Sequence, residues 1–114
     1  MKIMGEQPKN AATGYKKEKA VANWLKRHGF EILYEGGRGP ADIIARNRSR
    51  KWAIQVKYTR SYDIDSTRFW EKDALIKLAK KEKGTAVLCS VVRTSVWFRS
   101  AKTYETLVRA FYEI

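Results

Sequence analysis

The chain has 114 residues, enough for one domain and too few for two independent hydrophobic cores. Hydrophobic residues make up 44% of the sequence and aromatic residues 12%, which excludes global disorder and predicts a packed core. A single cysteine, Cys89, and a single histidine, His28, exclude a disulfide framework, a cysteine-based zinc site and a multi-histidine metal centre. Because no apolar run could cross a bilayer and no secretory signal precedes the domain, we expect a soluble, cytoplasmic protein.

The charge of the chain favours a polyanionic partner. Twenty-four Lys and Arg residues against twelve Asp and Glu residues give a formal net charge of +12 and a pI of about 10.0. Such an excess attracts nucleic acid, although a charged surface that only keeps the protein soluble is an alternative explanation. A membrane-surface role is weaker, because no helix at either end of the chain pairs a broad apolar face with a basic one.

The first half of the chain predicts a basic arm, a helix and three strands. Residues 1–13 carry no periodicity and are expected to form a flexible basic N-terminal arm, so that residues 14–114 make up a single domain. A helical stripe follows, formed by Val21, Trp24, Leu25 and His28, and Gly29 ends it. Strands are predicted at 30–34, 42–46 and 52–58, the last two joined by a polar turn at 47–50.

The second half predicts a helix, two strands and a final helix. The second helix is expected from about residue 68 to 83, the strands at 85–92 and 95–99, and the final helix at the C-terminus. The final helix rests on one stripe, formed by Tyr104, Leu107, Val108 and Phe111. This order predicts an α/β fold with a mixed central sheet flanked by helices.

A polar group is predicted on one face of the hairpin formed by the second and third strands. A two-residue loop at residues 48–49 would place Asp42 opposite Gln55, and opposed residues project from the same face of a sheet. Lys57 lies two residues beyond Gln55 and shares that face. The opposite face receives the core residues Ile43, Ala45, Ile54 and Val56.

Glu18 lies on the inward stripe of the first helix, since it precedes Val21 by three residues and Leu25 by seven. An inward acid is unfavourable unless it is paired or binds a metal. Because the polar group on the hairpin is expected nearby, we favour a role for Glu18 as a metal ligand. The alternative is that Glu18 complements the helix dipole.

These residues suit metal-assisted phosphodiester hydrolysis. Asp42 is a hard oxygen ligand for Mg²⁺, and the Gln55 side-chain oxygen and the Val56 carbonyl could complete the protein ligands. Lys57 could orient the attacking water and offset phosphate charge. The alternative is a cross-strand salt bridge between Asp42 and Lys57 on a solvated face.

Basic residues surround the expected site and predict contacts to DNA phosphates. They are Lys16, Lys17, Lys19, Arg38, Arg60 and Arg68. Arg38 lies in the glycine-rich segment 36–40, which could admit a phosphate backbone or simply connect two strands.

The sequence resembles the PD-(D/E)xK, or restriction-endonuclease-like, nuclease superfamily, and within it most resembles the archaeal Holliday junction resolvases. The matching strings are Gly14-x-x-x-Glu18, Leu25-x-x-x-Gly29-Phe30, Pro40-Ala41-Asp42-Ile43-Ile44-Ala45 and Ile54-Gln55-Val56-Lys57. The resemblance implies an αβββαβ core, to which this chain would add a hairpin strand and a C-terminal helix. It also implies Mg²⁺ or Mn²⁺ as cofactor, branched DNA as substrate in recombination or repair, and a homodimer that makes two symmetric cuts.

By this resemblance the catalytic positions are Glu18, Asp42, Gln55 and Lys57, and the metal would be held by Glu18, Asp42, Gln55 and Val56. The chain departs from the resolvases in having Gln55 where they have Glu, and no serine in the glycine-rich loop. Three hypotheses follow: a structure-selective, Mg²⁺-dependent endodeoxyribonuclease closest to a junction resolvase; a restriction- or repair-type nuclease of the same fold; and a DNA-binding module whose catalysis is weakened by Gln55.

Overall fold

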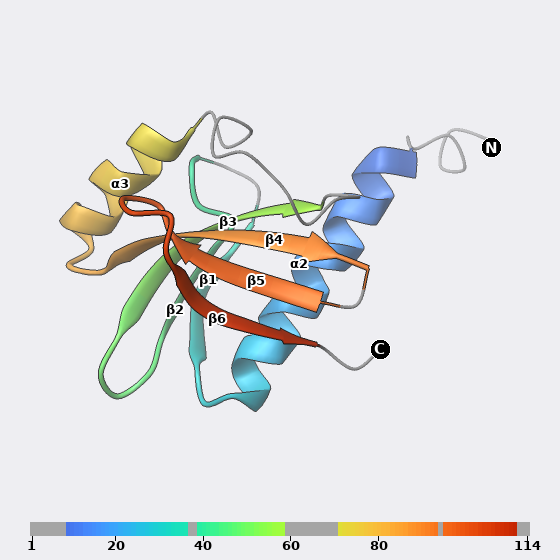
Figure 1. The fold of residues 1–114 in the computed structure, drawn as a ribbon, viewed down its shortest axis with the longest axis horizontal. Coiled ribbons are helices and arrows are strands. Elements are labelled where there is room, and N and C mark those ends of the chain that lie inside the picture. The colour runs from blue at the N-terminus through green and yellow to red at the C-terminus, as the bar shows by residue number, and fades with distance from the viewer. Residues whose placement is uncertain (1–8, 37–38, 59–70, 94, 112–114) are drawn as a thin grey trace.

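The protein folds around one mixed β-sheet (Figure 1). The computed structural model describes residues 9–36, 39–58, 71–93 and 95–111, and within these ranges it describes side chains from residue 18 to residue 110. The elements of these ranges are α2 (Lys9–Arg27), β1 (Glu31–Glu35), β2 (Ile43–Arg46), β3 (Lys51–Tyr58), α3 (Lys72–Lys81), β4 (Thr85–Val92), β5 (Ser95–Ser100) and β6 (Thr106–Phe111). The strand order is β1-β2-β3-β4-β5-β6, with β3 and β4 parallel and all other neighbours antiparallel. The predicted α/β class with a mixed sheet and flanking helices is confirmed.

Helix α2 is longer than the sequence pattern predicts. It begins at Lys9, so residues 9–13 are helical and the prediction that they belong to a flexible arm is wrong. Ala11 and Ala12 favour helix without contributing to an apolar stripe, which is why periodicity missed this turn. The predicted end is correct: Gly29 has a φ of +88°, a left-handed conformation that glycine adopts readily. Neither helix of the described ranges is long and apolar enough to span a membrane.

The β2–β3 hairpin has the predicted register. Its loop consists of two residues, since the Asn47 N–H donates to the Arg50 carbonyl at 2.8 Å. The Asn47 side-chain oxygen stabilises the turn by accepting from the Arg50 N–H at 2.9 Å. Ala45 therefore pairs with Trp52, and the residues before β2 lie opposite the second half of β3.

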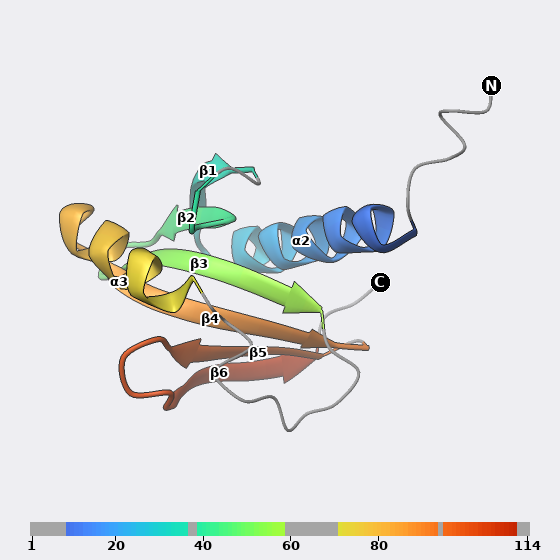
Figure 2. The same ribbon diagram turned by 90° about the horizontal axis from the view of Figure 1, so that it is seen from above.

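Two hydrophobic cores lie on opposite faces of the sheet. The core under α2 holds the large side chains: Val21, Ala22, Trp24, Leu25, Ile43, Ala45, Trp52, Ile54, Val87, Cys89, Val91, Val96 and Phe98. The core under α3 is smaller: Ala41, Ala53, Leu75, Ala79, Ala86, Leu88 and Ala101. Figure 2 shows the strands in order from β1 to β6, with α3 toward one end of the strands and α2 toward the other.

Helix α3 connects the parallel strands β3 and β4. The predicted helix of residues 68–83 is observed as Lys72–Lys81, and residues 68–70 lie outside the described ranges. After the helix, Gly84 packs so closely on β3 that an added Cβ would lie 2.6 Å from the Lys51 carbonyl oxygen. A helix that crosses between parallel strands starts near the C-terminal end of the first strand. The start of α3 is thereby brought toward the end of β3 that carries Gln55 and Lys57.

The C-terminal segment forms a strand, so the predicted final helix is wrong. Residues 106–111 are β6, which pairs with β5 and places Phe98 opposite Val108. Val108 and Ala110 pack against the core under α2. Their spacing of two residues is that of side chains on one face of a strand. A stripe over only eight residues fits a helix or a strand, and the available edge of β5 decided between them.

Candidate metal site

The open end of the β2–β3 hairpin holds Asp42 against β3. The Asp42 N–H donates to the Ile54 carbonyl at 2.8 Å, and the Val56 N–H donates to the Asp42 Oδ2 atom at 2.8 Å. Ile54 is also the strand partner of Ile43, so Asp42 lies one residue out of the register that would place it directly opposite Gln55. The two bonds hold its carboxylate at the Val56 backbone, next to Gln55 in the chain. One oxygen is thereby held by the backbone, and the second can bind a cation.

The surroundings of Asp42 disfavour its negative charge. Burial raises the pKa of the Asp42 carboxyl group, and the nearby Glu71 charge raises it further. The hydrogen bond from the Val56 N–H and the positive charge of Lys57 oppose this rise in pKa. A bound cation would act in the same direction as Lys57 and stabilise the ionised form.

Glu18 of α2 lies close enough to Asp42 for their charges to interact. Its pKa is raised to about 7, first by burial and then by the charges of Asp42 and Glu35, while Lys19 lowers it. The side chain is half-buried, as expected for an acid on the inward stripe. The structure thus brings Glu18 of α2 toward the acid at the start of β2, which the sequence alone could only suggest.

Gln55 is the buried member of the site, with 6% of its surface exposed. Its Nε2 atom donates to the Glu71 Oε2 atom at 3.1 Å. Its Oε1 atom is buried and has no hydrogen-bond partner among the described residues. The Trp24 Nε1 atom is the other buried side-chain atom of the described residues that lacks a hydrogen-bond partner. A buried acceptor with no donor among the described residues is unusual in a folded protein, and this oxygen is available to bind a cation.

Glu71 is a site residue that sequence analysis missed. It is the N-cap position of α3 and lies sixteen residues after Gln55 in the chain. In Figure 1 the first turn of α3, drawn in yellow, is the end of that helix nearer to the β3 arrowhead. The signal that could have found it was the topology. A crossover helix begins near the C-terminal end of the preceding strand, so an acid at its start lies close to that end.

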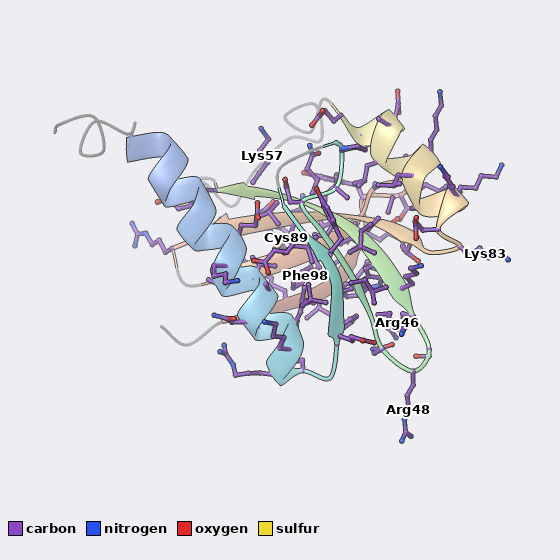
Figure 3. The ribbon with its side chains drawn as sticks, turned by 180° about the vertical axis from the view of Figure 1, so that it is seen from behind. Arg46, Arg48, Lys57, Lys83, Cys89 and Phe98 are labelled. Carbon is purple, nitrogen blue, oxygen red and sulfur yellow. The ribbon has the colours of Figure 1, made fainter. Side chains whose placement is uncertain are left out.

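Lys57 lies on the β3 face that carries Gln55, as predicted. Figure 3 shows it between α2 and α3, projecting away from the sheet. Its side chain is half-buried, and its charge reaches Asp42. No ion pair to Lys57 occurs among the residues that the structure describes, so the predicted salt bridge with Asp42, the alternative to a catalytic role, does not form.

The donor set of the site suits a hard cation that keeps most of its water. Within the described ranges, no three His, Cys, Asp or Glu side chains lie close enough together to hold a metal ion. Mg²⁺, however, takes only one or two carboxylates and retains several waters. Asp42 and the unpartnered Gln55 oxygen fit that requirement, and Glu18 adds negative charge nearby.

The predicted DNA contacts fall partly inside the described structure. Lys16 and Lys17 lie on α2, with side chains outside the description, and Arg38, Arg60 and Arg68 lie outside the described residues. Lys19 is exposed and forms an ion pair with Glu35 of β1 at 3.3 Å.

The single cysteine and the single histidine have structural surroundings. Cys89 is buried in the core under α2, and burial raises the pKa of its thiol. The His28 Nδ1 atom lies 2.8 Å from the Trp24 carbonyl oxygen, and its ring stacks on Trp24 with a centroid distance of 3.9 Å. Both residues therefore serve packing.

Comparison with known proteins identifies the fold. No family model matches this chain, and no curated protein matches it in sequence. Among solved structures, it is similar to Hjc, a Holliday junction resolvase from the archaeal hyperthermophile Archaeoglobus fulgidus, with a TM-score of 0.63 and 22% sequence identity. The similarity covers 82% of this chain and 84% of that chain. The chain therefore shares the fold of this archaeal Holliday junction resolvase.

Proposed function

We propose that this protein is a metal-dependent endodeoxyribonuclease that cuts branched DNA, in the manner of a Holliday junction resolvase. The observation that carries the proposal is the Asp42 carboxylate held at the Val56 backbone, where the neighbouring Gln55 has a buried oxygen without a partner among the described residues. Lys57 lies on the same face of β3 as Gln55. The net charge of +12 suits a DNA partner. A homodimer is part of the proposal, because two symmetric cuts need two active sites.

Each residue of the site has a distinct task in this proposal. Asp42 and Gln55 hold Mg²⁺ or Mn²⁺ through side-chain oxygens, with the Val56 carbonyl as a further ligand. The bound cation supplies charge stabilisation for the phosphoryl oxygens and the leaving group. Lys57 positions the attacking water and offsets charge on the phosphate. Glu18 would extend the acidic site from α2 and add negative charge near the cation.

The second candidate is a DNA-binding module with weakened catalysis. The observation that favours it is the neutral amide of Gln55, which removes one negative charge from the cation site. This candidate and the nuclease share the basic surface and the fold, so cleavage decides between them. A restriction- or repair-type nuclease differs from both by cutting plain duplex.

The test is cleavage of a four-way junction, a plain duplex and a single strand, with Mg²⁺ or Mn²⁺ and with chelator. We expect paired, symmetric cuts in the junction alone, and none with chelator. Asp42→Ala and Lys57→Ala should each lower the rate by at least ~100-fold, as expected for the loss of a group that stabilises transition-state charge.

The matched control is Lys77→Ala, which removes an exposed lysine of α3 and should leave the rate unchanged. Cutting of all three substrates would replace the resolvase assignment with that of a broader nuclease. Tight junction binding without any cut, even in Mn²⁺, would support the weakened module and refute the nuclease.

A further inference from the structure

The hydrogen bond between Gln55 and Glu71 fixes the orientation of the Gln55 amide. A carboxylate only accepts hydrogen bonds, so the amide must present its NH₂ group to Glu71. The Oε1 atom is then at the other end of the amide, where it is buried and without a partner among the described residues.

The same contact places a negative charge beside the position that departs from the resolvase motif. Position 55 carries a neutral amide where the resemblance predicts an acid, and the Glu71 Oε2 atom lies 3.1 Å from its nitrogen. Glu71 is near enough to act electrostatically on Asp42 as well. The charge absent from β3 is therefore present at the start of α3, on the same face of the sheet.

Without a bound cation, Glu71 and an acid at position 55 would repel one another. Two carboxylates at about 3 Å repel strongly unless they share a proton or a cation. The pair Gln55 and Glu71 therefore has the total charge of an acid at 55 with a neutral residue at 71. The two arrangements differ in which of the two residues carries the charge.

We propose that Glu71 is a positioning residue of the cation site: it turns the Gln55 Oε1 atom toward the cation and supplies the negative charge that Gln55 lacks. The inference rests on the proposed cation site and deepens it. It predicts that the site is retained when the charge is moved from position 71 to position 55.

The experiment measures Mn²⁺ binding to the full chain by calorimetry, without DNA, so that it does not depend on activity. Glu71→Gln should weaken binding by at least ~10-fold, the usual effect of removing a group that orients a metal ligand. The exchanged variant, Gln55→Glu with Glu71→Gln, keeps the total charge of the pair. We therefore expect it to bind Mn²⁺ within about threefold of wild type. Thermal unfolding with chelator checks that each variant is folded.

Asp73→Asn is the matched control, because Asp73 is an exposed acid of the same first helical turn and should leave Mn²⁺ binding unchanged. Binding by Glu71→Gln that equals wild type would overturn the inference while leaving the site intact. Equal weakening in Glu71→Gln and in the exchanged variant would also overturn it. If wild type binds no Mn²⁺, or Asp42→Asn binds as wild type does, the proposed cation site itself fails.

Discussion

The face of the sheet under α2 and the face under α3 differ in the side chains that they bury. Under α2, Phe98 packs against two tryptophans. Its ring centroid lies 5.2 Å from that of Trp24 and 5.4 Å from that of Trp52. Under α3 the apolar contribution comes largely from alanine. The buried polar residues of the described ranges all lie on the α3 face by their register: Gln55, Ser90, Ser95 and Arg99.

This difference separates stability from chemistry within one layer of strands. The α2 face buries large aromatic surface, which dominates core energetics. The α3 face accepts polar groups that are stabilised by specific partners: the Arg99 guanidinium, for example, stacks 3.3 Å from the Trp97 ring centroid. Adjacent residues of β3 therefore have different tasks, with Ile54 in the core and Gln55 in the site.

Phe98→Ala should produce the largest loss of stability and would test the assignment of the α2 face. Phe98 is fully buried and contacts both Trp24 and Trp52, so its removal leaves a cavity in a rigid aromatic cluster. We expect a loss of about 3–5 kcal/mol in the free energy of unfolding, measured with denaturant. Trp97→Ala, at the adjacent, half-exposed position, is the control and should cost less. Equal losses would show that the faces do not divide stability in this way.

Gln55→Leu should separate stability from cation binding on the α3 face. Leucine has a similar size and removes the buried oxygen that has no partner among the described residues, while half-exposed Glu71 can be hydrated instead. Replacing an unsatisfied buried polar group by an apolar one is neutral or stabilising. We therefore expect the free energy of unfolding, measured in chelator, to rise by up to about 1 kcal/mol. Mn²⁺ binding, measured in parallel, should be lost.

The result would be informative in either direction. A destabilised Gln55→Leu variant would mean that the Gln55–Glu71 hydrogen bond supports the fold and that the unpartnered oxygen is tolerated for structural reasons. Retained Mn²⁺ binding would mean that Gln55 is not a ligand.

The hairpin that carries the site was the most predictable region, because few physical factors determine it. Asn47 favours a tight turn, the loop length fixes the register, and the buried Ile43 and Ile54 fix which face is inward. The placement of Gln55 and Lys57 on one face of β3 follows from these local rules, whereas Asp42 departs from the register because its N–H donates to the Ile54 carbonyl. The resemblance to the resolvases added the fold, and the structure confirms it.

The errors lie where tertiary contacts override a local pattern. The segment 106–111 has a helical stripe but gains hydrogen bonds as the partner of β5, and Trp97 adds a side-chain bond to Thr106 at 2.9 Å. Glu71 was missed because its relation to Gln55 depends on where a crossover helix begins, which neither periodicity nor the nuclease motif contains. Sequence patterns thus located the side chains within strands and failed at contacts between elements.

Glu18→Gln should give the smallest effect, a change in how stability depends on pH in the presence of chelator. The pKa of Glu18 is about 7 in the folded protein against 4.5 for an ordinary glutamate, so the native state binds more protons between these values. Stability related to this group is therefore present below pH 4.5 and is lost as the pH rises through 7. Glutamine carries no charge at any pH and removes this loss.

The melting temperatures of Glu18→Gln and wild type should agree near pH 5, and the variant should be the more stable protein at pH 8. We expect a difference below about 1 kcal/mol, because Glu18 stays in contact with solvent that screens its charge. Glu105→Gln changes an exposed carboxyl group and should follow wild type at both pH values. A Glu18→Gln variant that does the same would place Glu18 in ordinary solvent and remove it from the acidic site.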